Sequence, residues 1–347
     1  MTRRNGSSAA AAAAMALALA AAATGAAASD PLDRLRAAGR LSEGEWRSLE
    51  RGDVVAKVID TEDRSEILSF AAARVRAKAE RVAAELRDRE GRAGEPWTLQ
   101  SGAVGEPAAA ADFAALALDP GDVKDLAHGR LNDCDVRLPN DAILSLRREL
   151  DGVPEAARQA RATAAFRQLL AANAAAYQAR GNPALLQYDN NGDPVRIADS
   201  LERVLQRSTL LQELAPDLFA FVRTFPAGRP PDVEQQVYWM KEKFWLLDVL
   251  SLDQLLLARR TLAQVPVTIV VSKQLYATHY YESSLGLTVF VESRPGDGWL
   301  FVVNRTRADI RRSGFSWVER LLIHHLVSRR LGARARHLRV RLERAAS

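Results

Sequence analysis

The chain has a single cysteine, Cys134, among 347 residues, so no disulfide framework within one chain can hold it together. After the first thirty residues no apolar run reaches membrane-spanning length, and we find no recognised catalytic or metal-binding motif. Hydrophobic residues make up 48%, an ordinary share for a globular protein. We therefore expect a soluble or peripheral protein that is stabilised by a hydrophobic core, with no cofactor and no metal.

The amino terminus has the layout of a secretory signal peptide. Arg3 and Arg4 form a basic start, Ala9 to Ala23 are apolar, and Thr24 to Ser29 are small residues suited to a signal peptidase. The sequence therefore predicts cleavage of residues 1–29 and an exported protein, periplasmic or secreted, made of a single domain over residues 30–347.

The positive charge is concentrated at the carboxyl terminus. From Arg311 onward there are ten arginines and two glutamates, a net charge of +8, whereas the whole chain carries +5. The seven arginines of Arg329–Arg344 indicate either peripheral contact with an anionic membrane surface or a solvated helix end. Nucleic acid is not an expected partner, because export argues against it and no nucleic-acid motif is present.

The hydrophobic pattern predicts an α+β fold. Period-two alternation predicts strands at Val54–Asp60, Ile67–Arg76 and Asp248–Arg259, and three more within Val265–Asp309. The turns between the later strands are short, so these strands must be antiparallel. Period-four spacing predicts a helix at Lys78–Asp88, a long final helix from Phe315 to Arg344, and a mainly helical insertion over 139–245. That insertion includes predicted helices at Glu155–Arg180 and Val233–Phe244.

This order of elements resembles the helix-grip architecture of the START and Bet v 1-like superfamily. The resemblance rests on Val54 to Asp88 and on Leu246 to Arg344. It implies a curved antiparallel sheet packed on the carboxyl-terminal helix around an apolar cavity. The segments Tyr276 to Leu285, Val303 to Asp309 and Asp133 to Leu138 also look like those of a group of exported bacterial proteins without an assigned activity. Neither resemblance carries over a catalytic residue.

The candidate site lies in the strands after residue 264, where polar residues are dense. Alternation puts four residues of the first of these strands on one face, and a strand after the Pro295–Gly298 turn carries another four. The eight expected cavity residues are Leu275, Ala277, His279, Tyr281, Phe301, Val303, Arg305 and Arg307. We expect them to hold an apolar or amphipathic small molecule, a lipid among the candidates, with the two arginines at a polar head group.

Two other functional classes remain open. His279 with Asp309 or Glu282 suits a hydrolase or cyclase that uses histidine as a general base. A non-catalytic envelope protein that binds a protein partner needs none of these residues. Cys134 lies between two aspartates, which disfavour the thiolate, so a cysteine nucleophile with His128 is not expected.

One further segment, Asp189–Asp193, begins like a calcium loop. It has proline where such a loop needs glycine, and we interpret it as a turn.

Overall fold

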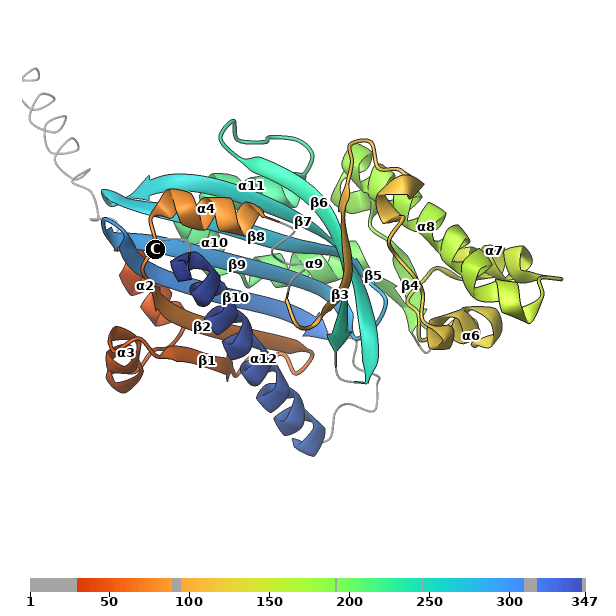
Figure 1. Ribbon diagram of the computed structural model, residues 1–347, viewed down its shortest axis with the longest axis horizontal. Helices are drawn as coiled ribbons and strands as arrows, with labels where there is room; N and C mark the ends of the chain where they lie inside the picture. Colours follow the sequence, from red (N-terminus) through yellow and green to blue (C-terminus); the bar gives the residue numbers. More distant parts are fainter. Residues whose placement is uncertain (1–29, 89–94, 191, 245, 309–316, 345–347) are drawn as a thin grey trace, which may run out of the picture.

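The computed structural model describes residues 30–88, 95–190, 192–244, 246–308 and 317–344, with side chains of the last segment from residue 324 onward. The predicted signal peptide and Asp309 therefore lie outside the described residues. The described part is α+β: one large antiparallel sheet of eight strands is covered by helices on both faces (Figure 1). The predicted fold class is confirmed at this level.

The sheet has the strand order β1-β2-β10-β9-β8-β7-β6-β3, and all neighbouring pairs are antiparallel. Its strands are β1 (Val54–Ile59), β2 (Glu66–Val75), β3 (Thr98–Val104), β6 (Glu234–Phe244), β7 (Leu247–Leu262), β8 (Val265–Ala277), β9 (Tyr281–Arg294) and β10 (Asp297–Ala308). A separate hairpin joins β4 (Gln187–Asn190) to β5 (Asp193–Arg196). The segment Asp189–Asp193 is thus the turn of that hairpin, as expected.

The prediction of a helix at Val233–Phe244 is wrong, because this segment forms strand β6. The segment contains valine, tyrosine and tryptophan in its middle, and these residues favour strands. Alternate residues also point to opposite faces, with Val237 and Trp239 on one side and Tyr238 and Met240 on the other. Pairing with β3 and β7 satisfies its backbone on both sides. The mainly helical insertion therefore ends before β6.

The helices are of very different lengths. They are α2 (Pro31–Ala38), α3 (Glu43–Glu50), α4 (Ala79–Arg87), η1 (Ala110–Phe113), α6 (Pro120–His128), α7 (Asn140–Leu150), α8 (Glu155–Arg180), η2 (Asn182–Ala184), α9 (Ile197–Gln206), α10 (Thr209–Leu214), α11 (Pro216–Thr224) and α12 (Trp317–Arg344). The expected helix at Glu155–Arg180 is confirmed with the same bounds. Sequence reasoning missed α6, although a signal was present, because Asp119 followed by Pro120 is a usual helix start.

The two faces of the sheet carry different helices, and we name each face after one of them. Helices α4 and α12 pack on the α12 face, whereas α2, α3 and α9 pack on the opposite, α9 face (Figure 1). The larger hydrophobic core lies on the α9 face, where Phe70 packs on Phe301 and Trp46 on Trp299. Helices α6, α7 and α8 lie beyond β3 and β6 (Figure 1).

Helix α12 contacts the edge strand β1 and, at the other side of the sheet, β6, which is next to the edge strand β3. On the β1 side Gly332 allows close approach, since a Cβ there would lie 3.2 Å from the Ala56 side chain of β1. On the β6 side Arg334 donates to Glu242 of β6, and the Arg330 guanidinium lies 5.1 Å from the Phe244 ring centre. The helix thus spans from β1 to β6, with the central strands between these two contacts in the strand order.

Candidate functional site

The α12 face of the sheet has an apolar half and a polar half. In the apolar half, Leu300, Phe290 and Val270 pack with Leu342 of α12 and with residues of α4. Towards the other end of the same strands the residues on this face become polar or small. They are Asn304 and Thr306 on β10, Ser284 and Gly286 on β9, Ser272 and Gln274 on β8, and Ser251 and Asp253 on β7. We call this set the polar half.

The polar half is a hydrogen-bonding surface on central strands. The Ser284 hydroxyl donates to the Asn304 side-chain oxygen at 2.9 Å, and the Asn304 amide nitrogen donates to Thr306 at 3.1 Å. Ser284, Asn304 and Ser272 remain partly exposed. The side-chain oxygen of Gln274 is buried and accepts no hydrogen bond from the residues that the structure describes. Buried polar atoms normally find a partner, so this oxygen has capacity for one.

Among its described residues, the side of α12 that faces the sheet packs on a hydrophobic core towards the carboxyl-terminal end only. Residues at helical spacing along this side are His324, Ser328, Leu331, Ala335, Leu338 and Leu342. Ala335 and Leu342 are 2% and 0% exposed, and Leu338 is partly buried against the core of the apolar half. Ser328 and Leu331 also keep an intermediate exposure but belong to neither hydrophobic core. Between Ala335 and Leu342 the helix therefore packs on the core of the apolar half, whereas Ser328 and Leu331 lie outside that core. Arg330, near Leu331 in the chain, lies over the Phe244 ring, and that ring contacts Tyr281 at the start of β9, the end of the strand that carries Ser284.

Among the eight expected cavity residues, Tyr281 is the one at the border with α12. Its ring lies 5.6 Å from the Phe244 ring, and burial raises its pKa, with the charges of Arg330 and Glu242 acting on it as well. The hydroxyl is therefore a neutral hydrogen-bond donor at physiological pH. Such a group suits ligand orientation better than proton abstraction.

Phe301, Val303, Arg305 and Arg307 point away from α12, and the expectation that they line a cavity beneath that helix is corrected. Leu300 belongs to the core on the α12 face, so alternation along β10 sends Phe301 to the α9 face. There Phe301 is fully buried against Phe70, with ring centres 6.2 Å apart. The sequence pattern defines the two faces of β10 but does not say which one meets the final helix.

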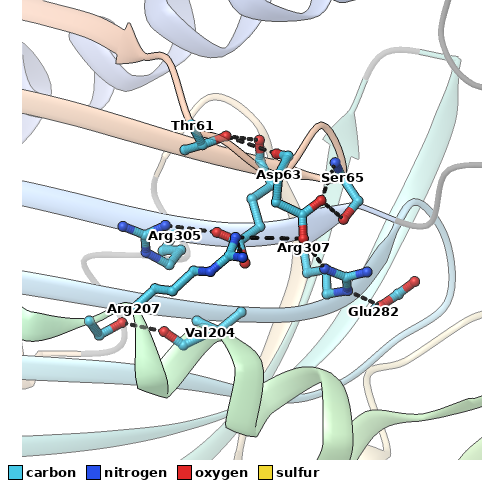
Figure 2. Close-up of polar contacts among 10 residues, drawn as sticks. Thr61, Asp63, Ser65, Val204, Arg207, Glu282, Arg305 and Arg307 are labelled. Atoms are coloured by element: carbon cyan, nitrogen blue, oxygen red, sulfur yellow. Dashed lines mark hydrogen bonds and ion pairs between the residues drawn. The ribbon is translucent and has the colours of Figure 1, made fainter.

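Arg305 and Arg307 belong to an ionic network on the α9 face (Figure 2). Arg305 donates to Glu66 at 2.7 Å, and the Glu66 side chain is fully buried. Arg307 donates to Asp63 at 2.8 Å and to Glu282 at 2.7 Å. These bonds knit β2, β9 and β10 together where the strands end.

The pKa of Asp63 shows how strongly this network favours the ionised form of a carboxyl group. Burial alone would raise the pKa of Asp63, but hydrogen bonds from Ser65 and Arg307 outweigh burial and lower the pKa to about 2. The Glu282 carboxylate also accepts from the Ser200 hydroxyl at 2.7 Å. Arginines and hydroxyl groups therefore donate hydrogen bonds to Asp63, Glu66 and Glu282. This arrangement is typical of a structural network that holds strand ends together.

Leu275, Ala277 and His279 are buried where β8 ends, and His279 contacts Asp122 of α6. The His279 ring nitrogens lie 3.0 Å from the backbone oxygen of Asp135 and 3.1 Å from Asp122. The backbone oxygen can only accept, so Nδ1 is the donor to Asp135, and Nε2 faces the Asp122 carboxyl. The histidine contacts this carboxylate and not that of Glu282, and both its nitrogens are in use.

We expect replacement of His279 by alanine to destabilise the protein by about 2–4 kcal/mol, because it leaves Asp122 and a backbone carbonyl without their hydrogen-bond partner. Denaturant unfolding measures the change. Replacement of His128, which is exposed on the same helix as Asp122, is the control and should change stability by less than about 0.5 kcal/mol. An alanine variant with unaltered stability would contradict the structural role.

Cys134 has the environment of an inert thiol. Its sulfur lies 2.7 Å from a carboxylate oxygen of Asp125, and burial followed by this carboxylate raises the pKa of the thiol. His128 is exposed and is not a hydrogen-bond partner of the sulfur. Within the part of the chain that the structure describes, no three His, Cys, Asp or Glu side chains gather as metal ligands do.

Four arginines of α12 form hydrogen bonds or ion pairs within the protein. Arg330, Arg334, Arg339 and Arg341 bond to the backbone or to acids of the sheet and of α4. Arg329, Arg336 and Arg344 are exposed. Peripheral contact with a membrane stays a prediction, and these three residues would carry it.

Comparison with protein-family models, with curated proteins and with solved structures finds no match for this chain. None of the helices in the described residues is long and apolar enough to span a bilayer. Sequence reasoning missed the polar half, although a signal was present. Ser272, Ser284 and Thr306 are polar residues on strands that run through the middle of the sheet.

Proposed function

We propose that this protein binds a small amphipathic molecule between the polar half of the sheet and the amino-terminal half of α12. The observation that carries the proposal is the contrast along α12, where Leu338 and Leu342 pack on the core of the apolar half while Ser328 and Leu331 stay partly exposed outside it. A sheet face that only supports a helix is normally filled with apolar side chains. Here central strands present hydroxyls and amides instead.

The chemistry of this surface defines the class of ligand. Asn304, Gln274 and the hydroxyls of Ser284 and Ser272 offer uncharged donors and acceptors, beside the carboxyl group of Asp253. Apolar contact comes from neighbouring residues of the same two surfaces, which are Val302, Met240 and Leu331. A molecule with several hydroxyl or amide groups and an apolar portion can contact both the polar and the apolar residues of this site. A plain hydrocarbon would leave the polar groups desolvated and without partners, at a cost of about 1–3 kcal/mol each.

The order of elements supports a helix-grip arrangement for this site. The final helix follows β10 directly in the chain and is bounded by β1 on one side and by β6 on the other. In such an arrangement a ligand lies between helix and sheet, as the resemblance to the START and Bet v 1-like superfamily implies. The predicted signal peptide at residues 1–29 adds an exported location to the proposal.

Organic extraction of the protein purified from a periplasm, followed by mass spectrometry, tests the proposal. We expect a stoichiometric small molecule with hydroxyl or amide groups, and an intact mass that corresponds to cleavage near Ser29. Repeated preparations without any bound molecule would count against a tightly bound ligand. They would favour the enzyme or the partner-binding alternative.

Replacement of Gly286 by valine should empty the site without unfolding the protein. A Cβ at this position would lie 3.5 Å from the Ser272 side chain and 3.7 Å from the Asn304 oxygen, which is ordinary contact. The β-branched side chain suits a strand and fills space in the polar half. We expect at least a tenfold loss of bound molecule in the extract.

The matched control is Ser293→Val, which lies in an exposed position of the same strand. It should retain the molecule. Thermal unfolding of both variants within about 3 °C of the parent protein would show that the fold is kept. Full retention of the molecule in folded Gly286→Val protein would place the ligand elsewhere.

A further inference from the structure

A small pocket lies on the α9 face, on the other side of the sheet from the proposed ligand site. It has a volume of about 130 Å³ and is bounded by β2, β9, β10, α2, α10 and the two residues that precede α10. Its floor is apolar and is formed by Leu68, Leu285, Leu287 and Val303. An apolar cavity of about 150 Å³ is known to hold benzene, so this volume suits a molecule of that size and not a full lipid.

The charged residues that line the pocket are both arginines, Arg207 and Arg305. They differ in how firmly they are held. Arg305 donates to the buried Glu66 at 2.7 Å. Arg207 approaches Glu66 at 3.2 Å and Asp63 at 3.6 Å, and its side chain is 44% exposed. Figure 2 shows its long side chain reaching across the network towards these acids.

Arg207 can turn away from the network at the cost of its ion pair with Oε1 of Glu66, a buried oxygen that accepts no hydrogen bond from the described residues. Glu66 keeps the bond from Arg305, and Asp63 keeps the bonds from Arg307 and Ser65, if Arg207 turns to another anion. An arginine fork at the mouth of an apolar pocket matches a carboxylate in both shape and charge. The hydroxyl of Thr209, another residue that lines the pocket, adds a hydrogen-bond donor.

We propose that this pocket binds a small carboxylic acid with a short apolar body, such as a six-carbon or simple aromatic acid. The carboxylate meets Arg207, and the apolar body lies on Leu285, Leu287 and Val303. This site is separate from the one under α12, because it lies on the other face of the sheet.

Titration calorimetry of the full-length protein with sodium hexanoate tests the inference, with hexanol and hexylammonium as probes of the same length. We expect saturable hexanoate binding with a dissociation constant on the order of 1 mM or lower. Binding of the alcohol should be at least tenfold weaker, and the cation should not bind. Equal binding of all three probes, or no binding of hexanoate up to about 20 mM, overturns the proposal.

Two variants locate the binding. Arg207→Gln should weaken hexanoate binding at least tenfold, whereas Arg203→Gln, an exposed arginine one turn earlier on α9, should change it less than twofold. Ala38→Leu fills the pocket from α2 and should abolish binding. Circular dichroism and thermal unfolding confirm that each variant is folded. Unchanged binding in folded Arg207→Gln and Ala38→Leu proteins overturns the assignment to this pocket.

Discussion

Replacement of Lys273 by methionine is expected to stabilise the protein by about 2–4 kcal/mol at neutral pH. Lys273 is fully buried on β8. Its ammonium contacts the Asn182 oxygen at 3.0 Å and lies 4.9 Å and 5.0 Å from the Tyr177 and Phe225 rings. Within the described residues it forms no ion pair, and burial lowers its pKa from 10.5 to about 7. Methionine has a similar length and no charge to desolvate.

The same residue predicts a pH dependence of stability. Between about pH 7 and pH 10 the unfolded chain keeps the proton that the folded protein has lost, so the unfolding free energy of the parent rises with pH. Below pH 7 the full cost of burying Lys273 is present. In Lys273→Met this rise should vanish, so the gain from the substitution should shrink towards pH 10.

Urea unfolding at a series of pH values from about 6 to about 10 measures both effects. The matched control is Lys124→Met, an exposed lysine of α6, which should change stability by less than about 0.5 kcal/mol. A methionine variant that is less stable than the parent at neutral pH would mean that the aromatic and amide contacts outweigh the cost of burial.

The second large effect is expected at the ionic network. Arg305→Met should destabilise the protein by about 2–4 kcal/mol, because it leaves the fully buried carboxylate of Glu66 without its hydrogen bond. Arg207 compensates only in part, since its nearest approach to Glu66 is 3.2 Å. Loss of this bond also weakens the pairing of β2 with β10 where the strands end.

A double-mutant cycle separates the pair from its surroundings. Glu66→Met combined with Arg305→Met should recover most of the loss, because no buried charge then lacks a partner. Arg74→Met is the control, since the Arg74–Asp297 pair joins the other end of the same two strands but is 35% and 21% exposed. That variant should lose less than about 1 kcal/mol. Equal losses in both single arginine variants would contradict a special role for burial.

Many elements could be predicted because their pattern is local. Helix α8 ends at Gly181 followed by Pro183, which are ordinary stop signals, and its predicted bounds agree with the structure. Strands β1, β2 and β8 to β10 were also expected, since they alternate clearly between turns. Strand β6 was not, because a short apolar stretch flanked by charged residues fits period two and period four alike until its neighbours are known.

The candidate site was only partly predictable. The dense polar region after residue 264 does contain the proposed ligand surface, but the eight expected residues are divided among three places. Leu275, Ala277 and His279 are buried at the end of β8, where His279 contacts α6, Tyr281 lies at the border with α12, and Phe301 packs on the α9 face. Alternation separates the two faces of a strand, and it cannot state which helix will cover each one.

The sequence by itself determined the class of the fold, the antiparallel pairing of the late strands and the long final helix. Each of these depends on contacts between residues near one another in the chain. Only the tertiary structure decided that α12 covers Leu300 and leaves Phe301 to the other face. It also decided that Glu66 meets Arg305 across 239 positions. The physical reason is that packing energy depends on which surfaces meet, and that is a property of the whole folded chain.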